Sequence, residues 1–328
     1  MPGVAQAKSD WYQRGTSMAP RFQWNANDGY CGETSFISAG MQYGEYSSQW
    51  TVRALVDDSA PQWKASSQLL LGVNAAKAAR EMRLTMVAFP SKTQRSTPQF
   101  LQWVKDRFLR GNVVIIGVYN NVTTLGEPAS LADPDYDHIV PVMGIGSAHR
   151  LSDHRYYAND SIAISDNGLY NIGPNIPYLY EYRMGSFMRN RAQASAAGGP
   201  LYSLRETPPN YGVAVTGVVD TDGFTVPVRL TSSANGEGVQ NQPRLTTQPT
   251  AFPITLTATV TLPDPTVAYN VYLYDGFGDV PRGQFNANAA QAMQSWSIPP
   301  GTSHTWKVTI DAMSSDTRVF RAVPASAP

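Results

Sequence analysis

The sequence predicts an α+β fold in two parts, and three observations support this prediction. Apolar residues recur at helical spacing in the chain up to about residue 125. Short, β-branched apolar runs follow, up to about residue 184. Beyond residue 205, apolar and polar residues alternate with period two in short runs. Pro, Gly, Asn and Asp residues separate these runs. We therefore expect helices first, then an antiparallel sheet, then an all-β region.

Two segments carry the clearest helical pattern. In Ser66–Leu84 the apolar residues at helical spacing are Leu69, Leu70, Val73, Ala76, Ala79 and Met82. The second segment begins with the capping residue and early proline of Thr97-Pro98 and ends before Gly111. A third helix is expected over Thr34–Gly44, after a run of turn-forming residues.

Strands are expected after these helices. In the first part they cover Val113–Tyr119, His138–Gly144, Ser161–Ser165 and Tyr178–Met184. Together with the helices they form a first domain, which we place at residues 1–195.

The run Gln193–Pro200 is rich in Ala, Gly and Ser and indicates a linker. The strands expected beyond it are Tyr211–Val219, Phe224–Leu230, Ile254–Leu262, Ala268–Tyr274 and Thr305–Ile310. Short strands with closely spaced turns predict a β-sandwich domain over residues 205–328. We expect it to pack on the first domain without sharing its core, and to carry no catalytic group.

The composition narrows the functional class. Only 15% of the residues are charged and the formal net charge is zero, so no basic surplus points to nucleic acid. No apolar run is long enough to span a membrane, and the first residues lack the apolar stretch of a signal peptide. The triplets Asn121-Val122-Thr123 and Asn159-Asp160-Ser161 match glycosylation sites. We expect a secreted or extracellular protein, although a cytoplasmic one has the same kind of start, and the oligomeric state stays open.

Cys31 is the only cysteine, so it can form neither an internal disulfide nor a zinc site by itself. It is a packed core residue, a surface thiol or a nucleophile. The turn formers Asn27, Asp28 and Gly29 precede it, and a helical pattern follows from Thr34. Free N–H groups and the dipole at a helix N-terminus favour a thiolate. This setting favours the role of Cys31 as a nucleophile, although free cysteine also packs well in cores.

A nucleophilic cysteine needs a base, and His138 has the most suitable setting of the four histidines. It opens a predicted buried strand, whereas His149, His154 and His304 lie in polar loops. The strand Ser161–Ser165 ends at Asp166, whose carboxylate would orient the imidazole. Asn167 and Asp160 are the alternatives for this orienting role. Taken singly, a residue such as His138 is more often a core histidine than a base, and one such as Asp166 is more often a turn residue.

The order Cys, His, Asp and the contexts of these residues resemble the papain-like cysteine peptidase superfamily. The closer resemblance is to its branch related to the double-glycine leader peptidases of bacterial exporters. That branch carries a glutamine, a short loop and a Gly-Cys-type turn that opens a helix, and Gln23 followed by Gly29–Ser35 is similar. The branch then has a helix leading into a Gly-x-Pro-Val-Ile-Val strand, which Phe100–Gly117 resembles, with Asn112 where proline is common.

The resemblance covers roughly the first 190 residues and implies a papain-like fold for them. Gln23 would supply its side-chain amide to an oxyanion hole beside the Cys31 N–H. Papain itself has its glutamine at the spacing of Asn25, so the choice between Gln23 and Asn25 stays open.

A Cys31, His138 and Asp166 triad would hydrolyse a peptide or amide through a thioester, without a cofactor or a metal. With an amine as acceptor, the same groups would catalyse acyl transfer. A non-enzymatic two-domain binding protein on a papain-like shell is the rival hypothesis.

Overall fold

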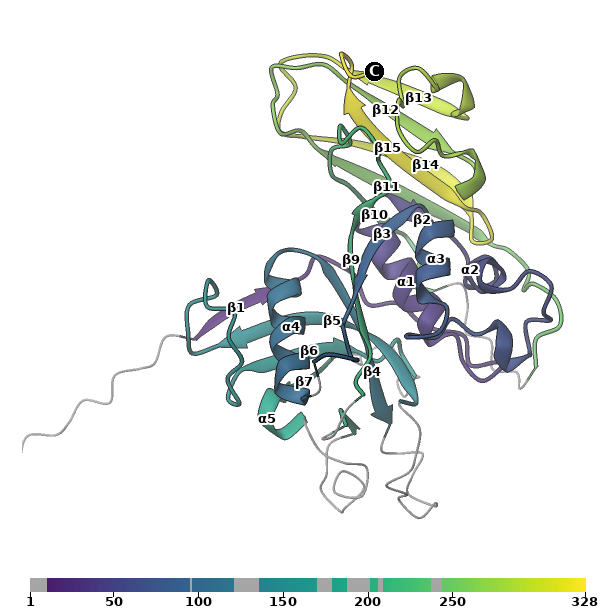
Figure 1. Ribbon diagram of the computed structural model, residues 1–328. Coiled ribbons are helices and arrows are strands. Elements are labelled where there is room, and N and C mark those ends of the chain that lie inside the picture. Colours follow the sequence, from purple (N-terminus) through teal and green to yellow (C-terminus); the bar gives the residue numbers. More distant parts are fainter. Residues whose placement is uncertain are drawn as a thin grey trace, which may run out of the picture.

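The structure is a computed structural model, and it describes residues 11–94, 96–120, 136–169, 179–187, 201–205, 209–236 and 244–328. In this part of the chain five α-helices accompany antiparallel sheets, which confirms the predicted α+β class. A first unit combines helices with a sheet, and a second unit consists mainly of strands (Figure 1). The predicted linker Gln193–Pro200 lies outside the described residues.

Four of the described helices precede β4 (Val113–Asn120), and a short one follows β7 (Leu179–Arg183). They are α1 (Cys31–Met41), α2 (Gln49–Val56), α3 (Ala75–Glu81), α4 (Thr97–Leu109) and α5 (Met184–Phe187). The start of α4 is fixed by a capping box, because the Ser96 hydroxyl accepts from Gln99 N while the Gln99 side chain accepts from Ser96 N. The helix predicted from Thr97 is therefore confirmed.

The helix predicted over Ser66–Leu84 is shorter than its pattern indicates, since α3 begins only at Ala75. The Asn74 side chain accepts a hydrogen bond from Leu70 N at 2.7 Å and donates one to Gln68 O at 2.8 Å. Such side-chain bonds to the local main chain replace helical hydrogen bonds. The periodic apolar residues before Asn74 (Leu69, Leu70 and Val73) thus lie outside the helix.

The first sheet has eight strands, and every pairing in it is antiparallel. Its order is β3 (Leu84–Ala88), β9 (Gly212–Val218), β4 (Val113–Asn120), β5 (His138–Ser147), β6 (Ser161–Ser165) and β7 (Leu179–Arg183), with β1 (Tyr12–Gly15) on β5 and β8 (Tyr202–Ser203) on β4. Alternate residues of β4 enter two cores: Ile115 packs in the core that contains α1, and Ile116 in the core that contains α4. Burial on both faces explains why β4 is apolar along almost its whole length.

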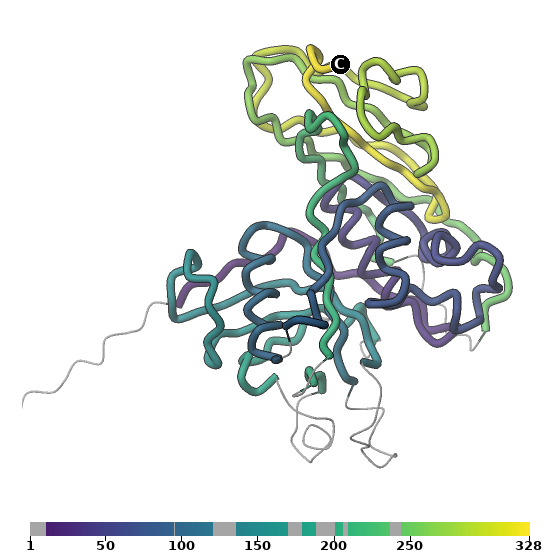
Figure 2. The backbone as a smooth tube through the Cα atoms, in the orientation of Figure 1, coloured from purple at the N-terminus to yellow at the C-terminus, as the bar shows by residue number. Residues whose placement is uncertain are grey.

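One strand of this sheet comes from the region that we assigned to the second domain. Strand β9 lies between β3 and β4, and its Val213 is opposite both Ala88 and Ile115. Figure 2 shows this green segment running among the blue strands of the first unit. The strand expected over Tyr211–Val219 therefore exists, but its place in the second domain was wrong. Its period-two pattern fits any half-buried strand and does not specify the partner.

A chain that ends at Gly198 is therefore expected not to fold. It would lack β8 and β9, leaving β3 without its neighbour and the apolar residues of β4 exposed along one edge. Far-UV circular dichroism and urea unfolding of this fragment, beside the full chain, would measure the effect. A cooperative transition at the midpoint of the full chain would contradict the expectation.

The second unit contains two antiparallel sheets. One has the order β10 (Val228–Ser232), β11 (Pro253–Thr261) and β14 (Thr305–Met313); the other has β13 (Gln294–Ile298), β12 (Tyr269–Tyr274), β15 (Arg318–Pro324) and β2 (Glu45–Tyr46). Strand β2 belongs by sequence to the first unit, yet Tyr46 pairs with Arg318 and Glu45 with Val319.

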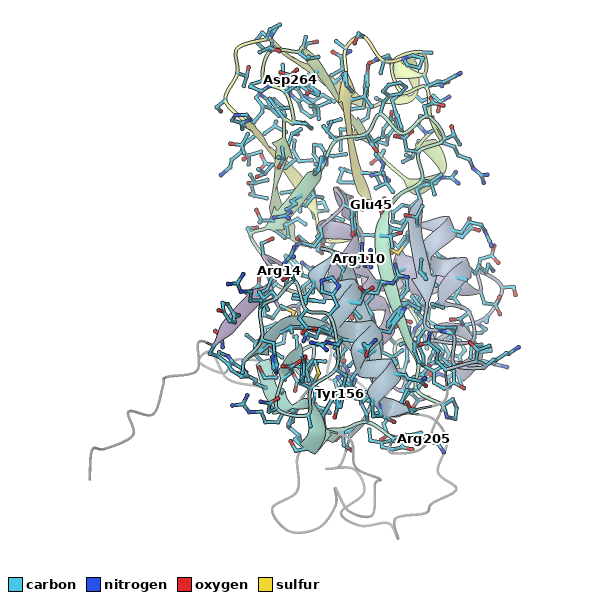
Figure 3. The ribbon with its side chains drawn as sticks, turned by 60° about the vertical axis from the view of Figure 1, so that its left-hand side comes forward. Arg14, Glu45, Arg110, Tyr156, Arg205 and Asp264 are labelled. Carbon is cyan, nitrogen blue, oxygen red and sulfur yellow. The ribbon has the colours of Figure 1, made fainter. Side chains whose placement is uncertain are left out.

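The two units also share one core, contrary to our expectation. Phe36 of α1 belongs to the same cluster of buried apolar residues as Leu256 and Phe320 of the second unit. Glu45 and Arg321 form a buried ion pair across the junction, where Figure 3 shows Glu45. Burial raises the pKa of Glu45 to about 7, and the Arg321 charge opposes this shift. Every residue of α1 after Cys31 is buried, so this helix needs apolar cover from both units.

Candidate active site

Cys31 is the first residue of α1, and a left-handed turn leads into it. Asn27, Asp28 and Gly29 have φ values of 51°, 60° and 92°. Three consecutive residues in this region are costly for the two that carry side chains, so the surrounding structure must hold the turn. The predicted position of Cys31 at a helix start is confirmed.

Arg53 of α2 holds this turn from inside the protein. Its Nη1 donates to Asn27 O at 3.1 Å, and its Nη2 donates to Gly29 O. Its Nε donates to Glu33 Oε1 at 2.6 Å, forming an ion pair with no more than 1% exposure on either side. The guanidinium also lies 3.7 Å from the centre of the Tyr30 ring. Arg53 was not predicted as a site residue, because it lies on another helix and no local pattern in the sequence marks it.

Leu245, late in the chain, also holds this turn through hydrogen bonds. The Asn27 side chain accepts from Leu245 N at 2.8 Å and donates to Leu245 O at 3.2 Å. An amide side chain that pairs with both polar groups of one peptide behaves like a strand neighbour. The turn before Cys31 is thus tied to a segment more than 200 residues later in the chain.

His138 begins β5 and is 2% exposed. Its Nε2 lies 2.9 Å from the main-chain oxygen of Asp166, and its ring stacks on Tyr202 with 5.8 Å between centroids. A carbonyl oxygen can only accept, so Nε2 carries the hydrogen. Burial lowers the pKa of His138 to about 4, so the ring is neutral near pH 7. The lone pair of the neutral imidazole is therefore on Nδ1.

Asp166 meets His138 through its main chain, whereas we predicted that its carboxylate would do so. The carboxylate accepts from Tyr202 Oη at 3.1 Å and from Gly168 N at 2.9 Å. The adjacency itself follows from topology, because β5 begins where its antiparallel neighbour β6 ends. Tyr202, which touches both residues, follows a long segment without a periodic pattern and was not foreseen.

Asn167 connects the three segments of the site. Its Nδ2 donates to Ile139 O at 3.0 Å, to Ser35 Oγ at 3.0 Å and to Cys31 O at 3.3 Å. Two amide hydrogens are thus shared among acceptors on α1 and β5, while the residue itself follows β6. Asn167, an alternative for orienting the histidine, instead joins the cysteine helix to the histidine strand.

The thiol has a raised pKa, opposite to our expectation for a helix N-terminus. Burial and the neighbouring Glu33 carboxylate raise the pKa of Cys31 to about 11, against the N–H of Ile139, the Arg53 charge and the N–H of Gly32. Within the described residues no hydrogen bond joins the Cys31 sulfur to the His138 ring. The predicted thiolate–imidazolium pair is therefore absent, and both groups are neutral near pH 7.

Of the two oxyanion-hole candidates, Gln23 lies at the site. Its main-chain N donates to Asn167 O at 2.8 Å, and its amide nitrogen lies close to Gly29. It is 6% exposed, and its Oε1 has no partner among the described residues, whereas Asn25 is exposed. Asp160 is not at the site, because its carboxylate forms a buried ion pair with Lys105 at 2.7 Å beside α4.

The part of the chain that the structure describes contains no group of three or more His, Cys, Asp or Glu side chains that could hold a metal. None of the described helices is long and apolar enough to cross a membrane. Comparison with protein-family models, curated proteins and solved structures finds no match.

Proposed function

We propose that this protein is a cysteine-dependent hydrolase that cleaves peptide or amide bonds through an acyl-enzyme on Cys31. The observation that carries the proposal is the meeting of three segments at one point. The start of α1, the start of β5 and the residues after β6 are joined there by the Asn167 side chain. The His138–Asp166 hydrogen bond leaves the imidazole lone pair on Nδ1, as a general base requires.

The proposed reaction forms and breaks a thioester. The Cys31 sulfur attacks the substrate carbonyl while His138 Nδ1 takes the thiol proton. The N–H of Cys31, which has no partner within its helix, and the Gln23 amide stabilise the oxyanion. His138 then protonates the leaving amine, and water that it activates releases the acid and restores the thiol.

The proposed architecture is a papain-like first unit with a β-sandwich second unit. The cysteine helix followed by an antiparallel histidine strand and its neighbour supports the first assignment. Two antiparallel sheets whose apolar side chains share a core support the second. The domain boundary at residues 195–205 stays a prediction, although β9 beyond it pairs with strands of the first unit.

Export from the cell remains part of the proposal. In the triplet Asn159-Asp160-Ser161 the Asn159 side chain is exposed, so a glycan could reach it, while Asn121 lies outside the described residues. Expression in a secreting eukaryotic cell would test this site. If glycosidase treatment lowers the mass of Asn159→Gln by as much as that of the wild type, Asn159 does not carry the glycan.

The raised pKa of the Cys31 thiol leads to a prediction about its rate of alkylation. Because the pKa of Cys31 is raised to about 11, iodoacetamide should alkylate it slowly at pH 7. The rate should rise about tenfold per pH unit from pH 7 until the pH approaches 11, following the thiolate fraction. Mass spectrometry of the native chain, with Cys31→Ala as the unlabelled control, gives these rates. A plateau at or below pH 8 would show that the thiolate is already stabilised.

A second prediction separates the main chain of Asp166 from its side chain. Asp166→Asn keeps the carbonyl that accepts from His138, so kcat/KM should fall by less than about tenfold, the effect of roughly one perturbed hydrogen bond. Asp58→Asn, at an exposed aspartate away from the site, is the matched control. A loss as large as that of a His138 variant would show that the carboxylate itself orients the ring.

The decisive experiment is a screen of a broad peptide library with the wild type and Cys31→Ala. Hydrolysis by the wild type alone, with an acyl adduct on Cys31 trapped by acid quenching, supports the proposal. An added amine that diverts the acyl group into a new amide would identify acyl transfer instead. Equal products from both proteins would contradict cysteine chemistry.

The rival function, a non-enzymatic binding protein on a papain-like shell, has one observation in its favour. The raised pKa of the Cys31 thiol and the absence of a hydrogen bond to His138 are typical of a structural cysteine. This alternative predicts that no library peptide is cleaved, and that Cys31→Ala binds the same peptides as the wild type.

A further inference from the structure

A cleft of about 560 Å³ opens between the two units, and neither Cys31 nor His138 lines it. Its walls come from residues 14–17, 42–43, 108, 111–113, 216–218, 225–229 and 320–321. This volume is in the range of small-molecule sites, which often lie between domains. The cleft therefore has the size and position of a binding site separate from the proposed hydrolase centre.

The lining carries positive charge and no carboxylate. Arg14, Arg229 and Arg321 line the cleft, and none of the lining residues is Asp or Glu. Arg321 is buried and pairs with Glu45. Arg14 and Arg229 are exposed and form no ion pair with any carboxylate in the described part of the chain. Figure 3 shows Arg14 on the first unit, near the level where the second unit begins.

Neutral acceptors position the two exposed guanidinium groups. Arg14 Nη1 donates to Leu109 O, and Arg229 Nη1 donates to Ser17 Oγ at 3.0 Å. Ser17 Oγ in turn donates to Gln42 Oε1 at 3.2 Å, which extends the support of Arg229. A guanidinium has five N–H donors in a planar fork, so each group retains donors suited to the paired oxygens of a carboxylate or phosphate.

The remaining lining mixes polar and apolar side chains in similar numbers. Tyr43 donates its hydroxyl hydrogen to Val215 O at 2.8 Å. Burial raises the pKa of Tyr43, and the nearby Arg229 charge opposes this shift. Hydroxyl and amide side chains at the cleft are Thr16, Ser17, Gln42, Asn112, Thr216 and Thr225. Such a lining suits an anionic head group on a small body that has both hydrogen-bonding and apolar parts.

We propose that this cleft binds a small organic anion, with Arg14 and Arg229 recognising its carboxylate or phosphate group. The site lies outside the proposed hydrolase centre, so it holds whether or not Cys31 is catalytic. A bound anion would contact both units and stabilise the full chain against unfolding, because it binds only the folded state.

Isothermal titration calorimetry on the full-length protein tests the proposal, with inorganic phosphate in one arm and succinate in the other. Chloride holds the ionic strength constant in both arms. Saturable one-to-one binding of either anion is the expected result. Binding of phosphate alone identifies a phosphoryl ligand, binding of succinate alone a carboxylate ligand, and binding of both the chemistry that they share. No saturable binding in either arm would overturn the proposal.

Variants locate the binding. Arg229→Gln should raise the Kd roughly tenfold or more, and Arg229→Lys, which keeps the charge but not the fork, should have a smaller effect. Arg14→Gln, as a single variant with Arg229 intact, should also raise the Kd. Arg282→Gln, at an exposed arginine outside the cleft, is the matched control and should leave the Kd unchanged. A wild-type Kd in folded Arg229→Gln and Arg14→Gln proteins would show that the anion binds elsewhere.

Discussion

Replacing His138 by glutamine is expected to lower kcat/KM by about 10²–10⁴-fold on any peptide that the wild type cleaves, the usual contribution of a general base. A glutamine amide can still donate to Asp166 O at this buried position, so the local hydrogen bond survives. What is lost is the lone pair of Nδ1, which we propose takes the thiol proton. Steady-state kinetics of the wild type and His138→Gln would measure the loss.

The same variant has a stability readout that does not depend on a substrate. Burial lowers the pKa of His138 from 6.5 to about 4, so below about pH 6.5 the unfolded chain binds a proton that the folded protein does not. The wild type should therefore lose about 3 kcal/mol of stability as the pH falls from 6.5 to 4. His138→Gln should lack this component. Equal acid sensitivity of both proteins in urea unfolding would contradict the buried neutral imidazole.

Replacing Arg53 by methionine is expected to destabilise the protein by about 3–5 kcal/mol, because it leaves the buried Glu33 carboxylate without its charge partner. The substitution also removes the donors to Asn27 O and Gly29 O. The left-handed turn before Cys31 would then lose the group that holds it. We expect a lower urea midpoint and faster alkylation of the thiol, since a looser turn lets water reach the sulfur.

Arg80→Met is the matched control for this experiment. Arg80 also pairs with a glutamate, Glu81, but its side chain is 60% exposed, so its loss should change the stability by less than about 1 kcal/mol. If Arg53→Met cost no more than the control, the Glu33–Arg53 pair would not be what maintains the turn.

The sequence predicts the positions of the site residues better than their contacts. A turn followed by a helical pattern places Cys31 at a helix start, and an apolar run places His138 at a strand start. Both are local properties, and local patterns specify them well. Asp166 is found because β6 follows β5 as its antiparallel neighbour. Its main-chain contact with His138 depends on the geometry of one turn, which no residue pattern encodes.

The errors share a physical origin in long-range pairing. Period-two alternation identifies β9 as a strand but contains nothing about which sheet it joins. Likewise the Glu45-Tyr46 pair is too short to show a pattern, yet it forms an edge strand of the second unit. The thiol pKa was misjudged for a related reason: the helix start was visible in the sequence, whereas the burial and the fixed orientation of Glu33 were not.

The interlaced strands also set the order in which the protein can mature during synthesis. Strand β9 leaves the ribosome long after β3 and β4, whose gap it fills, and β2 waits for β15 near the end of the chain. Such distant pairings form late, because a long loop must close before any contact rewards it. A growing chain thus carries Cys31 and His138 before the sheets around them are complete. Under the proposed chemistry, activity requires β9 and β15 to be in place, so a nascent chain that ends before them cannot cleave its neighbours.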